Sequence, residues 1–200
     1  MPLLEKPRLW IVAGPNGSGK STLYGRTDIK DFGRSVWIIN PDILTEHIAK
    51  QEGLSLDVAN IETLNRIQKW LRISIRTYKT VGVETVLSTG KYRRLVRLAK
   101  AYGFEVRLLY VTLKTADLNI KRVRDRVKKG GHNVPENKIV HRRERSFRQL
   151  PWFLDQADFA LIYDNSSKTP KLVGKKEDGI IVLDPAAPEH IRKAVLSLRS

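Results

Sequence analysis

The sequence predicts an α/β protein in which helices cover both faces of a mostly parallel sheet. Three observations lead to this fold class. Short apolar runs alternate with amphipathic helical segments, an alternation typical of right-handed strand–helix–strand crossovers. A glycine-rich loop directly follows the first apolar run. With 200 residues, 41% of them apolar, and no proline- or serine-rich linker, the chain fits a single domain over residues 1–200.

The glycine-rich loop begins where the first apolar run, residues 9–13, ends, and it satisfies the pattern G-x-x-x-x-G-K-[ST]. Its glycines let consecutive backbone N–H groups curl around phosphate oxygens, while Lys20 reaches the outer phosphates and Ser21 ligates Mg²⁺. A helix is expected to begin near Lys20, so that its positive end faces the polyphosphate. A purely structural glycine turn is the alternative. The predicted nucleotide-binding residues are Gly14, Pro15, Asn16, Gly17, Ser18, Gly19, Lys20, Ser21 and Thr22. The loop makes the predicted fold a P-loop NTPase type.

Two elements follow this loop. Residues 36–39 are expected to form a buried strand that ends at Asn40, and Pro41 suits the first turn of the next helix. Residues 58–79 carry apolar side chains at spacings of three and four, which predicts one buried face of a long helix. That face consists of Ile61, Leu64, Ile67, Leu71, Ile75 and Tyr78. We interpret it as core.

The remaining elements continue the alternation. A strand over 83–87 leads to a basic helix over 92–101, which Gly103 closes, and then to the clearest strand, 104–112. A helix over 117–129 is broken by Gly130-Gly131, and Pro135 starts another that runs to residue 148. Residues 159–163 form a further strand, two short strands at 171–173 and 180–183 make a tail, and the last helix starts at Pro188.

Positive charge is concentrated in one part of the chain. The formal net charge is +16, and residues 121–148 hold eleven Lys or Arg and three acidic residues, which is half of the excess. This density predicts a helical, arginine-rich lid with Gly130-Gly131 as its hinge, because lid arginines can neutralise a phosphoryl group during transfer. A solvated basic helix face is the alternative.

Two carboxylates are candidates for chemistry at the carboxyl ends of the strands, where parallel sheets bind ligands. Asp42 could accept a proton from an acceptor hydroxyl or hold the metal through water, or it could cap the helix that Pro41 opens. Glu84 is expected to begin its strand, where substrate could serve as its partner, and an exposed edge position is the alternative. Asp164 and Asp184 also follow apolar runs, a pattern that any buried strand ending in a turn produces.

Several motifs, in this order, resemble those of the zeta toxin family of P-loop kinases. They are residues 14–22, Asn40-Pro41-Asp42, residues 84–88, the segment R-V-x-x-G-G-H-x-V-P at 126–135, Arg142, and residues 163–166. The resemblance spans roughly residues 8 to 167, and the glycine–histidine segment is its most specific part. Two positions depart from the pattern. Arg143 stands where an aromatic residue is expected, and Ser88-Thr89-Gly90 differs from the usual turn.

The resemblance implies roles at the matching positions. Lys20 is similar to the family's phosphate-binding lysine, Asp42 to its catalytic base, and Arg126 and Arg142 to the arginine pair that stabilises the transferred phosphoryl group. Glu84, with Thr85 beside it, is similar to the carboxylate that contacts the acceptor sugar. The implied activity is a Mg²⁺-dependent kinase that transfers the γ-phosphate of ATP or GTP to a nucleotide sugar such as UDP-N-acetylglucosamine. The implied protein partner is an antitoxin.

Composition restricts the other possibilities. The chain has no cysteine, which excludes disulfides and thiolate zinc sites, and its first apolar run is too short for a signal peptide or membrane span. A cytoplasmic protein is therefore expected. The alternative function is a polynucleotide kinase or nucleic-acid-binding P-loop ATPase, suggested by the charge of +16, although the four tryptophans are too scattered to predict a stacking platform. A small-GTPase-like switch is a third hypothesis, but the N/T-K-x-D motif is absent.

Overall fold

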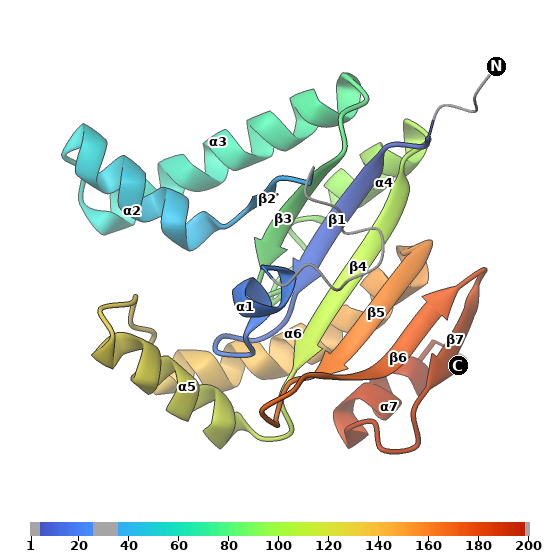
Figure 1. The fold of residues 1–200 in the computed structure, drawn as a ribbon. Helices are drawn as coiled ribbons and strands as arrows, with labels where there is room; N and C mark the ends of the chain where they lie inside the picture. Colours follow the sequence, from blue (N-terminus) through green and yellow to red (C-terminus); the bar gives the residue numbers. More distant parts are fainter. Residues whose placement is uncertain (1–4, 26–35, 199–200) are drawn as a thin grey trace.

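The computed structural model describes residues 5–25 and 36–198, and within them it has one mixed sheet (Figure 1). The strand order is β2-β3-β1-β4-β5-β6-β7. Strands β2, β3, β1, β4 and β5 run parallel, and β6 and β7 are added antiparallel at one edge. The predicted α/β fold with a mostly parallel sheet is confirmed.

The elements alternate along the chain as expected. The strands are β1 (Arg8–Ala13), β2 (Ile38–Ile39), β3 (Val81–Thr85), β4 (Glu105–Thr112), β5 (Phe159–Asp164), β6 (Lys171–Glu177) and β7 (Ile180–Leu183). The helices are α1 (Lys20–Tyr24), α2 (Pro41–Glu52), α3 (Leu56–Arg76), α4 (Arg93–Ala101), α5 (Ala116–Lys128), α6 (Glu136–Gln156) and α7 (Glu189–Leu196). No helix in the described ranges has the length and apolarity that a membrane crossing needs.

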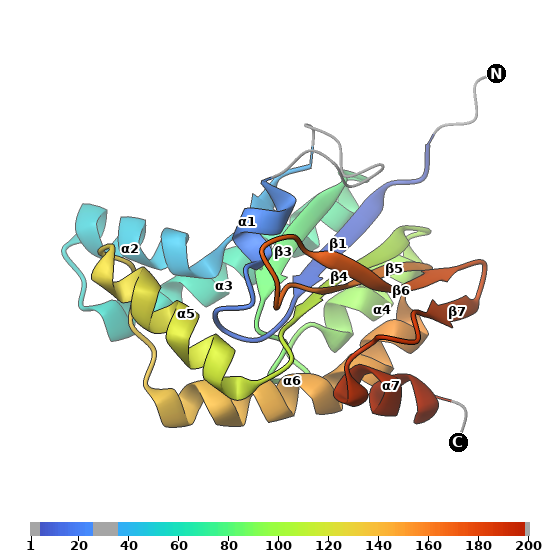
Figure 2. The same ribbon diagram turned by 60° about the horizontal axis from the view of Figure 1, so that its bottom comes forward.

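Helices lie on both faces of the sheet, but unequally. Leu9 and Ile11 of β1 face the larger core, which α3, α4, α6 and α7 cover. Trp10 and Val12 point to the opposite face and pack with Leu23 of α1. Figure 2 shows α4, α6 and α7 below the sheet and the short α1 above it. This alternation along β1 is what a strand buried on both faces requires.

The predicted apolar face of α3 is buried only where the helix crosses the sheet. Ile67, Leu71 and Ile75 are buried in the larger core. Ile61 is 63% exposed and Tyr78 is 62% exposed, so their assignment to the core was wrong. The helix ends at Arg76, two residues before Tyr78, whose φ of 55° lies outside the helical region. Periodicity thus identified the correct face but not where the sheet beneath it stops.

The expected buried strand at residues 36–39 is a short edge strand instead. Only Ile38 and Ile39 are in β2, which pairs with β3 alone, and Trp37 is 69% exposed. The Trp37 ring meets Trp70 of α3 edge to face at a centroid distance of 5.3 Å. An aromatic contact therefore replaces the burial that the apolar run predicted.

Helix α6 is longer than predicted. It continues past residue 148 to Gln156 with Pro151 inside it. A proline within a helix costs about 3 kcal/mol because it removes a hydrogen bond. Burial of Leu150, Phe153 and Leu154 in the larger core opposes that cost. Half of α6 is thus core, and only its first half belongs to the predicted lid.

Asp164 is the last residue of β5 and Asp184 directly follows β7, and each side chain stabilises the turn after it. Asp164 accepts hydrogen bonds from the backbone N–H and the hydroxyl of Ser166, and Asp184 accepts one from the Ala186 N–H at 2.6 Å. Among the described residues, no three His, Asp or Glu side chains gather as a metal cluster. Both aspartates therefore fit the structural interpretation of their position.

Two substitutions in α3 test where the core lies. Leu71→Ala removes a fully buried side chain and is expected to lower the free energy of unfolding by about 2–5 kcal/mol. Ile61→Ala, in the exposed part of the same helix, is expected to cost no more than about 0.5 kcal/mol. Urea denaturation measures both, and equal losses would contradict this assignment of the core.

Candidate active site

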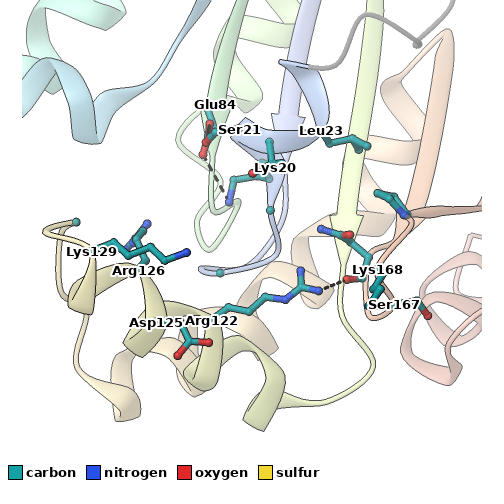
Figure 3. Close-up of a pocket in the computed structure, with 16 residues that line it drawn as sticks. Lys20, Ser21, Leu23, Glu84, Arg122, Asp125, Arg126, Lys129, Ser167 and Lys168 are labelled. Atoms are coloured by element: carbon teal, nitrogen blue, oxygen red, sulfur yellow. Dashed lines mark hydrogen bonds and ion pairs between the residues drawn. The ribbon is translucent and has the colours of Figure 1, made fainter.

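A cavity of about 600 Å³ lies between the phosphate loop, α5 and the β5–β6 link. Lys20 and Ser21 line it from α1, Arg122 and Arg126 from α5, and Lys168 from the link. Figure 3 shows the arginines projecting from α5 on the side that faces the phosphate loop. A concave, strongly basic site at the carboxyl edge of the sheet suits a polyphosphate.

The phosphate loop has the geometry that its glycines predict. Helix α1 begins at Lys20, as expected, with Gly19 before it at a φ of 87°. Gly17 has a φ of 72°, and a Cβ there would lie 2.6 Å from the Asn119 carbonyl oxygen of α5. A side chain at Gly17 is excluded both by backbone strain and by this close approach.

Lys20 is buried at the centre of the site, with 6% of its surface exposed. Its Nζ donates to the carbonyl oxygens of Gly14 at 2.8 Å and Pro15 at 3.2 Å, and lies 3.7 Å from Oε1 of Glu84. Burial lowers the pKa of Lys20, and the negative charges of Glu84 and then Asp42 oppose that effect. The ammonium group therefore depends on these two carboxylates.

Glu84 is the fourth of five residues in β3, near its carboxyl end, and β3 lies between β2 and β1. The predicted position at the start of a strand is therefore wrong, because the strand begins two residues earlier than its apolar pattern predicted. The alternative, an exposed edge position, is also wrong, because β3 has a neighbouring strand on each side. Its Oε2 accepts hydrogen bonds from Ser21 Oγ at 2.8 Å and Asn40 Nδ2 at 3.1 Å. The buried carboxylate thus has partners on α1 and at the start of α2.

Ser21 and Glu84 together fit a magnesium site. Mg²⁺ binds hard oxygen ligands and commonly uses one or two carboxylates together with substrate phosphates. The Ser21 hydroxyl and the Glu84 carboxylate are such ligands, they are already in contact, and both line the cavity. These are the residues that would hold the ion.

Asp42 is an exposed residue in the first turn of α2, and it does not cap that helix. The cap is Asn40, whose Oδ1 accepts from the backbone N–H groups of Asp42 and Ile43. Burial lowers the pKa of Lys91, while the Asp42 charge raises it and the Arg142 charge lowers it further. Asp42 and Arg142 therefore both lie near Lys91.

The predicted lid consists of α5, the link 129–135 and the first half of α6. Arg126 lines the cavity and donates to the carbonyl oxygen of His132 at 2.7 Å, and its charge is one cause of the lowered pKa of Lys20. Arg142 is half-buried on α6 and is not among the residues that line this cavity. Thus Arg126 faces the phosphate loop, and Arg142 lies on the Asp42 side.

Three further residues hold the phosphate loop in place. Asn119 of α5 is fully buried and donates from Nδ2 to the Asn16 carbonyl at 2.6 Å. Asn165 follows β5 and donates to the Ser18 carbonyl at 2.8 Å, while Arg122 donates to the Asn165 carbonyl at 2.6 Å. Asn119 could not be identified from the sequence, because a single Asn in a helical segment has no distinguishing pattern.

Arg143 and Thr85 have structural contacts. Arg143 donates to the carbonyl oxygens of Leu113 and Lys114 and lies 4.5 Å from the Phe147 ring centroid, so this departure from the family pattern braces α6 against the end of β4. Thr85 Oγ1 accepts from the Leu87 N–H at 3.1 Å. Its predicted contact with the acceptor stays a prediction.

The architecture is shared with several solved structures. A chain of the AvrRxo1-ORF1–AvrRxo1-ORF2 complex with ATP aligns with a TM-score of 0.73 and 17% identity over 94% of this chain and 63% of that chain. A chain of the PezAT chromosomal toxin–antitoxin system of Streptococcus pneumoniae aligns with a TM-score of 0.60 and 17% identity, over 84% of this chain and 72% of that chain. A chain of the Pnkp1/Rnl/Hen1 RNA repair complex aligns with a TM-score of 0.58 and 16% identity, over 93% of this chain and 54% of that chain. The present chain spans less than two thirds of the AvrRxo1 and RNA repair chains.

Sequence comparison gives a relative and a family. A Haemophilus influenzae (strain Rd) protein without an assigned function is 28% identical over 147 residues, which are 70% of this chain and 99% of that protein. The family described as AAA domain matches residues 9–151, from β1 into α6, and so includes the phosphate loop, Asp42, Glu84 and the lid. With this match over most of its length, the chain belongs to the AAA domain family of P-loop proteins.

Proposed function

We propose that the protein is a Mg²⁺-dependent kinase that transfers the γ-phosphoryl group of ATP or GTP to a hydroxyl of a nucleotide sugar such as UDP-N-acetylglucosamine. The observation that carries this proposal is the cavity that Lys20, Ser21, Glu84 and Arg126 line together. Asp42 lies beside this group, two residues after Asn40, whose side chain donates to Glu84. A base, a lid arginine and a phosphate-binding lysine are the groups that phosphoryl transfer uses.

The donor nucleotide would occupy the cavity beside the phosphate loop. Backbone N–H groups of the loop and the ammonium of Lys20 bind its phosphates, and Ser21 with Glu84 would hold Mg²⁺, which neutralises phosphate charge when bound. Arg122 and Arg126 add positive charge from α5. Since these groups are fixed by packing before the reaction, they stabilise the charge that develops without reorganising.

Asp42 acts as the base on the acceptor side. The acceptor oxygen bonds to the γ-phosphorus as the bond to the β–γ bridging oxygen breaks, and the hydroxyl proton passes to the Asp42 carboxylate. Its exposure and its freedom from helix capping support this role. The nearby charges of Lys91 and Arg142 suit an anionic acceptor.

The nucleotide-sugar acceptor and an antitoxin partner rest on the motif resemblance and on the fold shared with the PezAT chain. We assign the acceptor contact to Glu84, with Thr85 beside it, and place the protein in the cytoplasm. Such an antitoxin would act by covering the nucleotide cavity.

Loss of Asp42 tests the proposed chemistry. With γ-labelled ATP, Mg²⁺ and UDP-N-acetylglucosamine, the wild-type protein is expected to label the sugar nucleotide, and Asp42→Asn to lower that rate by about 10²–10⁴-fold while still binding ATP. Lys20→Ala is expected to lose both the labelling activity and ATP binding. The control is Asp57→Asn, which removes the corresponding first-turn acid of α3 and should leave the rate unchanged. Label found only on free phosphate across a broad acceptor panel would contradict the kinase assignment.

Neighbouring arginines on α5 provide a test of the lid. Arg126→Ala is expected to lower kcat by about 10²–10³-fold, because a charge that stabilises the transferred group is lost. Arg124→Ala should have little effect, since that exposed side chain pairs with Glu136 at 2.7 Å. Steady-state kinetics distinguishes the two, and equal kcat values for both variants would remove Arg126 from the mechanism.

The tie between α5 and the phosphate loop predicts a binding defect. Asn119→Ala leaves the buried Asn16 carbonyl without its donor, a loss of about 1–3 kcal/mol, so a weaker affinity for a fluorescent ATP analogue is expected. Asn137→Ala, at an exposed position of α6, is the control. Unchanged affinity in a folded Asn119→Ala protein would show that the loop keeps its shape unaided.

A further inference from the structure

A second basic segment, separate from the lid, remains without a function. Residues 65–102 hold ten Lys or Arg and one acidic residue, a net charge of +9. Together with the +8 of residues 121–148, this segment slightly exceeds the formal charge of +16, so the rest of the chain has a net charge of −1. The one acid is Glu84, which is buried beside Lys20, and acids from other segments pair only with Arg66 and Lys100 among the described cations of residues 65–102.

These cations line two hollows that join on the outer side of α3 and α4. One, of about 350 Å³, lies between the two helices, and the other, of about 410 Å³, runs along α3. Both are lined by Gln68 and Arg72, so they are continuous, and neither is lined by an acidic residue. We call this surface the basic groove, defined by Lys69, Arg72, Arg76, Lys91 and Arg94.

Three of the five cations of the basic groove lack an acidic partner. Within the described residues, Lys69, Arg72 and Arg94 form no ion pair, whereas Arg66 of the same helix α3 pairs with Glu52 and Glu62. Lys69, Arg72 and Arg76 are spaced at three and four residues, so they repel one another along one helix face. The helix dipole compensates only Arg76, which is in the last turn. An external anion would relieve the repulsion.

We propose that the basic groove binds the phosphodiester backbone of single-stranded nucleic acid. Its concave shape suits a strand better than a flat membrane surface. Cations line the rim of both hollows, with Asn65 and Gln68 beside them. Of the apolar lining residues, Ile73 is exposed and Leu98 is half-buried, while Leu71, Tyr92 and Leu95 are buried. Protein interfaces instead favour aromatic and apolar centres and are depleted in lysine. Guanidinium, ammonium and amide donors are the groups that contact phosphate and sugar.

This surface shares only Lys91 with the proposed kinase site. None of its five cations lines the nucleotide cavity, and Lys91, which lies near Asp42, is left unchanged in the test below. Binding can therefore be measured without ATP or an acceptor, so a failure of the kinase proposal leaves this one untouched.

A pair of triple variants with equal charge tests the proposal. The groove variant combines Lys69→Gln, Arg72→Gln and Arg94→Gln, and the control combines Lys50→Gln, Lys171→Gln and Arg192→Gln at exposed positions elsewhere. The probe is a fluorescein-labelled RNA of about 20 nucleotides, followed by anisotropy from about 50 to about 300 mM KCl. Circular dichroism and thermal melting confirm that both variants are folded.

The expected result is local to the groove. The groove variant should lose at least about tenfold in affinity, and its slope of log K against log salt should flatten by about 2, since each contact with a single strand contributes about 0.7. The control should stay within about twofold of wild type. Equal binding of single-stranded DNA supports backbone recognition, and tighter RNA binding supports it with an added 2′-hydroxyl contact.

Other outcomes overturn the proposal. Equal weakening of both triple variants would mean that net charge, and not the groove, attracts the strand. Displacement of the RNA by poly-L-glutamate at equal charge would indicate an acidic protein partner instead. Binding to phosphatidylserine vesicles without binding to RNA would assign the surface to a membrane.

Discussion

The buried ammonium of Lys20 is the constraint on which the rest of this site depends. A charge with only 6% exposure is costly without partners, and here its partners come from the loop carbonyls and from Glu84. Glu84 is held in turn by Ser21 of α1 and by Asn40, which also caps α2. One buried positive charge therefore fixes the relative positions of β1, β3, α1 and the start of α2.

The other side of the cavity is fixed by amides. Asn119 and Asn165 donate to carbonyls of the phosphate loop and therefore occupy none of its N–H groups. Because Asn119 is near the start of α5, the helix that carries Arg122 and Arg126 is attached directly to the loop those arginines face. A fully mobile lid would bring its positive charges to the phosphates only when it closes. In this structure, Arg122 near the start of α5 already contacts Asn165 beside the phosphate loop.

Charge is divided between two surfaces with different surroundings. The lid cations face a cavity that also contains a buried carboxylate and hydroxyls, an arrangement suited to a small polyphosphate and a metal ion. The basic groove of α3 and α4 has no acidic lining residue and follows the outside of the sheet's larger core. The sequence shows the total of +16, but only the packing of the helices separates the charge of the basic groove from the charge that lines the nucleotide cavity.

The sequence by itself determined the features set by neighbouring residues: the phosphate loop, the helix that begins at Lys20, the strand–helix alternation and the buried face at Ile67, Leu71 and Ile75. These depend on local spacing and backbone conformation, which a linear pattern records. The tertiary structure decided the rest, because it depends on contacts between distant segments. Pairing with β3 alone left Trp37 exposed, core contacts carried α6 through Pro151, and strand register put Glu84 beside Ser21, 63 residues away. The amide of Asn119 acquired its role only when α5 packed against the loop, 103 residues earlier in the chain.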